Sequence, residues 1–152
     1  MPYVSQNIGA GNVKRASESV WKGMLITFMF GATLGALSAI FSARLSSLMS
    51  SDAEVIMYSR QKMIIISSTY FISGLNEILG AGMRGMKRPI IPTICTLIYM
   101  CAFRFVWVYL IFPLYRNLTF LYLVWPIGWI LSIITILFFY FPSIKKAKLR
   151  QE

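Results

Sequence analysis

The sequence predicts an all-α integral membrane protein with four transmembrane helices. Two observations predict this class: the composition and the presence of four long apolar runs. Hydrophobic residues make up 57% of the 152 residues, and charged residues only 13%. An average soluble domain carries about 25% charged residues, and a chain this short cannot hide so much apolar surface in a soluble core. The runs are also too long and continuous for β-barrel strands, which alternate over about ten residues.

Four apolar runs reach the length of about 20 residues that crosses a hydrocarbon core. They cover residues 23–43, 63–83, 89–115 and 118–141. Each run is expected to be a helix, because backbone polar groups in lipid must pair within their own segment. The chain is therefore interpreted as a single membrane region, 1–152, with a polar segment at 1–22 and a basic tail at 142–152. Before the second run, Ser51-Asp52-Ala53-Glu54 has the pattern of a helix N-cap followed by acid in the first turn.

The positions of lysine and arginine predict the orientation. Ten of the 15 lie on the side of the two termini and the middle loop: Lys14, Arg15, Lys22, Arg84, Lys87, Arg88, Lys145, Lys146, Lys148 and Arg150. Four lie on the opposite side: Arg44, Arg60, Lys62 and Arg116. The positive-inside rule places both termini in the cytoplasm, in a multi-pass protein of the cell (plasma) membrane. The basic residues separate apolar runs and form no patch with stacking aromatics, so membrane lipid is the expected partner and nucleic acid is not.

Two charges fall inside the runs, Glu77 in the second and Arg104 in the third. Intramembrane acids tend to line cavities or ion paths, so Glu77 is the candidate for binding a coupling cation or proton. The alternative is a structural hydrogen bond to a neighbouring helix. Arg84 stands about 10 Å further along the helix axis, a separation that predicts no direct ion pair with Glu77. Arg104 is expected at a different depth in the membrane, about 13 Å from Glu77. Its side chain either lies in the protein interior or extends to the outer lipid headgroups.

Small residues form two groups. Gly80, Gly82 and Gly85 follow Glu77, and glycines in spans permit either close packing or bending. We favour packing, and we keep Arg84, Arg104 and these glycines as structural or gating candidates. In the first run, Gly31 and Gly35 form a GxxxG pattern that Ala39 and Ala43 continue, which predicts a helix-packing face.

The sequence offers no set of catalytic residues. It contains no histidine, and Cys95 and Cys101 are six residues apart, about 600° around a helix, so they point to different faces. No nucleophile triad, P-loop or metal cluster is present in the sequence. We therefore expect a protein that is not an enzyme, with no metal and no cofactor other than Na⁺ or H⁺ as a coupling ion.

Several motifs in order along the chain resemble the multidrug and toxic compound extrusion (MATE) family. They are Val4-Ser5-Gln6-Asn7-Ile8-Gly9-Ala10-Gly11-Asn12, Asn76-Glu77 with Gly82-Met83-Arg84-Gly85, Pro89 and Pro92, Arg104-Phe105-Val106-Trp107 with Phe112-Pro113, and Tyr122-Leu123-Val124-Trp125-Pro126-Ile127-Gly128-Trp129. The resemblance implies a twelve-helix antiporter of two lobes that expels small organic, often cationic, substrates in exchange for Na⁺ or H⁺. This chain would supply the end of the eighth helix and helices nine to twelve, and Glu77 would take a carboxylate position seen in many relatives.

If the resemblance holds, the N-terminal lobe is missing from these residues, Met1 corresponds to an internal methionine, and the chain alone is an inactive fragment. Two other functions stay open from the sequence. One is a lipid-linked oligosaccharide flippase of the same superfamily. The other is a small, non-transporting four-helix membrane subunit.

Overall fold

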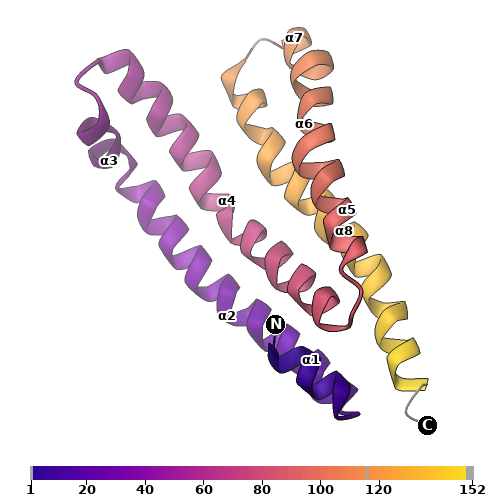
Figure 1. Ribbon diagram of the computed structural model, residues 1–152. Coiled ribbons are helices and arrows are strands. Elements are labelled where there is room, and N and C mark those ends of the chain that lie inside the picture. The colour runs from indigo at the N-terminus through magenta and orange to yellow at the C-terminus, as the bar shows by residue number, and fades with distance from the viewer. Residues whose placement is uncertain (1, 116, 150–152) are drawn as a thin grey trace.

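The computed structural model describes residues 2–115 and 117–149, and it places them in helices joined by short connections (Figure 1). Within these residues, four helical spans are long and apolar enough to cross a membrane: α2 (Val13–Ile40), α4 (Ala53–Gly85), the third span (Ile90–Tyr115) and α8 (Leu118–Leu149). Two shorter helices, α1 (Pro2–Gly9) and α3 (Ser42–Met49), accompany them. The predicted all-α membrane class is confirmed. Met1, Arg116 and Arg150 lie outside the described residues.

α2 and α4 begin before the predicted apolar runs and α8 ends after its run, because hydropathy locates the lipid-facing part of a helix and not its polar ends. α2 begins ten residues before the first run, after a turn in which Gly11 takes a positive φ of 81°. It ends at Ile40, and Phe41 separates it from α3. α4 begins at Ala53 because the Asp52 carboxylate accepts hydrogen bonds from the backbone N–H groups of Glu54 (2.8 Å) and Val55 (3.4 Å). The predicted N-cap is confirmed.

The third span is not a uniform α-helix. It consists of α5 (Ile90–Thr96), the π-helical stretch η1 (Leu97–Ala102), α6 (Phe103–Val106), the π-helical stretch η2 (Trp107–Ile111) and α7 (Phe112–Tyr115). Sequence analysis did not predict the π-helical stretches, which flank the turn that carries Arg104. π-helical turns are rare and occur frequently at functional sites.

α4 lies between α2 and α8, as Figure 1 shows. α2 runs antiparallel to α4, whereas α8 runs parallel to it, with Gln61 bonded to Thr119 (2.7 Å) near one end and Asn76 bonded to Ser132 (2.8 Å) near the middle. The connection between α4 and α5 lies at the same end of the bundle as α1 and the end of α8, and the other two connections lie at the opposite end. Nine of the ten basic residues counted on that side of the sequence, all except Arg150, are therefore brought to one end.

The packed core lies in the half of the bundle that carries the α4–α5 connection. Its buried hydrophobic residues come from all four spans and α1: Val4, Ala16, Val20, Leu79, Met83, Cys95, Ile136 and Tyr140. Elsewhere many large apolar side chains point outward, among them Phe30 (68% exposed) and Phe138 (74% exposed). An outer surface of this kind suits lipid or further transmembrane helices, which replace water around it.

Candidate functional site

The carboxylate of Glu77 points away from the packed core of these helices. Its side chain is 71% exposed, and its Oε2 atom lies 3.5 Å from Nη2 of Arg84, whose side chain is 36% exposed. The prediction that the two are too far apart for an ion pair was wrong. The axial rise between two residues measures backbone separation alone, and an arginine side chain can cover most of that distance along the helix surface.

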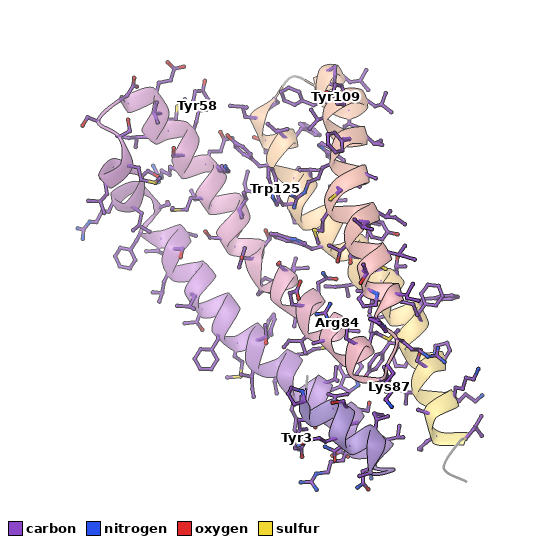
Figure 2. All side chains as sticks on the ribbon, in the orientation of Figure 1. Tyr3, Tyr58, Arg84, Lys87, Tyr109 and Trp125 are labelled. Carbon is purple, nitrogen blue, oxygen red and sulfur yellow. The ribbon has the colours of Figure 1, made fainter. Side chains whose placement is uncertain are left out.

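The Arg84 side chain passes over Gly80 of the same helix. A Cβ atom at Gly80 would lie 3.4 Å from Nη1 of Arg84 and 3.4 Å from Cβ of Pro92. The guanidinium therefore runs over a helix surface without a side chain, between α4 and the start of α5, to reach Glu77. The pair joins one charge of each sign on a single helix face, and Figure 2 shows Arg84 near the lower part of α4.

Gly82 and Gly85 fill a different role from Gly80. A Cβ at Gly82 would lie 2.9 Å from Cγ2 of Val20, and one at Gly85 would lie 2.7 Å from Cγ1 of Val4. Both glycines are buried, and α4 continues as a helix through Gly82 to Gly85. Their geometry is that of close helix packing against α2 and α1, the interpretation favoured from the sequence.

Asn76, next to Glu77, carries a buried polar contact that sequence analysis did not single out beyond the Asn76-Glu77 motif. Its Oδ1 accepts a hydrogen bond of 2.8 Å from the hydroxyl of Ser132 on α8, and both residues are buried. A carboxamide inside an apolar run was the signal available in the sequence. The contact fixes the rotation of α4 relative to α8, and this rotation leaves Glu77 on the uncovered side.

Arg104 does not contact Glu77. Its guanidinium carbon lies 5.0 Å from the ring centroid of Trp125 on α8, a cation–π arrangement, and its Nη2 lies 3.8 Å from Sδ of Met100. The side chain is half-buried. Arg104 thus joins the third span to α8 at the turn between the two π-helical stretches.

The small-residue face of α2 lies against α4. A Cβ at Gly31 would lie 2.9 Å from Cβ of Phe71, and one at Gly35 would overlap the backbone carbonyl oxygen of Ser67. Ala39 is half-buried, whereas Ala43 is exposed and belongs to α3, so the contact face does not extend that far. Beside this contact, an apolar groove of about 440 Å³ is lined by both helices, including Phe30, Tyr70 and Gly74.

A comparison with family models identifies the family of this chain. A family model named MatE matches residues 1–110, which include α1, α2, α4 and most of the third span. The chain belongs to the MatE family. The resemblance drawn from the sequence motifs is thereby confirmed, and Glu77, Gly80, Arg84 and Arg104 all lie within the matched residues.

Two proteins illustrate the similarity to known MatE members. Over 103 residues, 66% of this chain, it is 25% identical to a protein of Shewanella oneidensis named FAD transporter, of which the match covers 23%. Over 95 residues, 62% of this chain, it is 24% identical to the probable multidrug resistance protein YoeA of Bacillus subtilis, of which the match covers 20%. The chain thus spans between a fifth and a quarter of these relatives. No solved structure matches it.

The chemical groups of this MatE chain do not assemble a metal centre within residues 2–115 and 117–149, where no three His, Cys, Asp or Glu residues come together. Cys95 is buried and Cys101 exposed, and both are free thiols, as expected for residues on different helix faces. Glu77 carries the one carboxylate inside the four apolar runs, and its partner is the Arg84 guanidinium.

Proposed function

We propose that this chain is part of a cation-coupled efflux antiporter and is not an enzyme. The observation that supports the proposal best is an exposed carboxylate, Glu77, in the second half of the transmembrane helix α4, nearer the end that leads to α5. Acids in a span are costly unless they face a cavity or an ion path. The four described spans leave this carboxylate uncovered, so the cavity it faces would be completed by further helices, the N-terminal lobe that the family resemblance implies.

The Glu77–Arg84 pair suggests how coupling works. At 3.5 Å the two side chains attract each other without a short, two-point contact. A Na⁺ ion or a proton on Glu77 would compete with the guanidinium for the same oxygen. Binding of the coupling ion then releases Arg84 from the face of Gly80, and the freed guanidinium changes the charge offered to a cationic substrate.

The test is gradient-driven transport by the reconstituted transporter that contains this chain. Glu77→Gln should abolish movement that depends on an imposed Na⁺ or H⁺ gradient, with membrane insertion unchanged. Glu54→Gln, the same chemical change in the first turn of α4, is the matched control and should transport normally. Wild-type coupling in Glu77→Gln would show that the acid is structural.

Arg84→Gln tests the competition itself and should act in the opposite direction. With the guanidinium removed, the coupling ion should reach half-saturation at a concentration about tenfold lower, the ratio expected if the lost competition contributes ~1.4 kcal/mol. An unchanged or higher half-saturating concentration would refute competition at Glu77.

The substrates proposed are small organic compounds, cationic ones among them. The relatives' names differ on this point, since one is an FAD transporter and the other a probable multidrug resistance protein. The assay therefore includes both a cationic dye and FAD. We also propose that the 152 residues alone do not transport, and saturable, cation-dependent movement of either compound by this chain alone would contradict that.

We further propose a location in the plasma membrane with both termini in the cytoplasm. Lys148 and Asn117 are exposed at opposite ends of the bundle, so single cysteines there report the orientation. In a background with Cys95 and Cys101 replaced by alanine, Asn117→Cys should react with an impermeant thiol reagent added outside, and Lys148→Cys should not. The reverse pattern would overturn the orientation.

A further inference from the structure

A second hollow lies at the basic end of the bundle, about which the transport proposal says nothing. It has a volume of about 470 Å³ and is bounded by three separate parts of the chain: the turn after α1, the α4–α5 connection and the end of α8. Lys87, Arg88 and Lys146 line it, and no acidic residue among those that the structure describes does. Ile8 and Met86 supply apolar surface to the same hollow.

Lys87 takes a backbone conformation that is unusual for lysine. Its φ is +60°, in the left-handed region. The N–H of Arg88 bonds to the carbonyl of Met83 (3.1 Å) and the N–H of Lys87 to that of Arg84 (3.1 Å), which together form the Schellman motif that closes α4. Glycine is the usual residue at this position, because any side chain there is strained. Strained backbone positions cluster at functional sites. The strain at Lys87 therefore favours a role for its ammonium group in binding a ligand in this hollow.

Arg88 is held in place by α8. Its Nη1 donates a hydrogen bond of 2.9 Å to Oγ of Ser143, which is buried and itself donates to the carbonyl of Phe139 (2.6 Å). The guanidinium retains further N–H donors beyond that single bond. Figure 2 shows Lys87 at the same end, in the connection between α4 and α5.

We propose that this hollow binds the phosphate-bearing headgroup of an anionic phospholipid. Two flexible ammonium groups and one oriented guanidinium suit a phosphate diester, which accepts both kinds of donor. The location at the ends of the spans, together with the apolar contribution of Ile8 and Met86, favours a lipid over a soluble phosphate. Basic pockets between transmembrane helices on the cytoplasmic side bind such headgroups. We call this hollow the headgroup pocket.

The test compares two double variants that remove the same charge from the same end of the protein. Lys87→Gln/Lys146→Gln alters the headgroup pocket, whereas Lys145→Gln/Lys148→Gln removes two exposed tail lysines that do not line it. Binding of phosphatidylglycerol to the purified chain in neutral detergent is counted by native mass spectrometry. The pocket pair should weaken binding about thirtyfold, since each nearby cation contributes roughly a factor of five, and the tail pair less than about threefold.

Lys87→Gly separates binding from folding. Glycine relieves the left-handed strain, so thermal stability should rise while phosphatidylglycerol binding falls, and a residue with only a structural role would not move these readouts in opposite directions. Three results would overturn the proposal: equal losses in the two double variants, equal binding of phosphatidylcholine and phosphatidylglycerol, or binding of inorganic phosphate in place of the lipid with the same dependence on Lys87 and Lys146.

Discussion

Gly35→Ala gives the sharpest test of how α2 and α4 are held together. In a helix with free space around it, alanine is favoured over glycine by about 1 kcal/mol. At Gly35 the added methyl would fall on the backbone carbonyl oxygen of Ser67, which no side-chain rotation can move. The helices must separate, and overpacking of this kind costs about 1–3 kcal/mol. Because the overlap is with backbone, the upper part of this range, about 2–3 kcal/mol, applies. After the gain of about 1 kcal/mol from helix propensity is subtracted, Gly35→Ala is expected to destabilise the protein by ~1–2 kcal/mol net, roughly a five- to thirtyfold loss in the ratio of folded to unfolded protein.

Gly23→Ala on the same helix is the matched control. Its added methyl would meet only Cγ2 of Ile78, at the ordinary contact distance of 3.4 Å. The end of an isoleucine side chain can adjust, so this variant should be as stable as wild type or more stable by up to ~1 kcal/mol. The two identical substitutions are thus expected to change stability with opposite signs.

The assay is reversible unfolding in mixed micelles with increasing SDS, followed by tryptophan fluorescence, since Trp21 lies against Tyr140 and reports loss of the α2–α8 contact. The midpoint should fall for Gly35→Ala and hold or rise for Gly23→Ala. If Gly35→Ala is as stable as Gly23→Ala, the close approach of α2 to α4 does not hold the helices together, and the reasoning fails.

Two further side-chain contacts make predictions of their own. Ser132→Ala should destabilise the protein by ~0.6–1.7 kcal/mol, the range for interhelical hydrogen bonds in membranes, because it leaves the buried Asn76 carboxamide without its donor; no loss of thermal stability would show that this bond is not needed. Trp125→Leu should lower thermal stability more than Trp125→Phe, because phenylalanine keeps an aromatic face under the Arg104 guanidinium. Such a cation–π contact contributes about 0.5–2 kcal/mol. Equal losses in the two variants would show that only the lost side-chain volume matters.

The spans could be predicted from the sequence because lipid requires long apolar helices, and the N-cap at Asp52 because its signal is local. The Glu77–Arg84 pair could not, since it depends on the side-chain path over Gly80 and beside Pro92 of another helix. The π-helical stretches of the third span also escaped prediction. One of them lies close to α8, with the Gly128 Cβ position 3.0 Å from the Tyr99 carbonyl oxygen, and such a contact is set by tertiary packing.

The dependence of the third span on α8 has a consequence for biogenesis. Beyond α5, this span packs chiefly against α8, and both Arg104 and the Tyr99 hydroxyl find partners there, in Trp125 and Thr135. Ribosomes deliver α8 after the third span. The α2–α4 hairpin can therefore assemble as soon as it is synthesised, whereas the third span enters the bilayer with a guanidinium whose aromatic partner has not yet emerged. If that span stays beside the insertion machinery until α8 is synthesised, the Arg104 charge is not exposed to lipid without its partner.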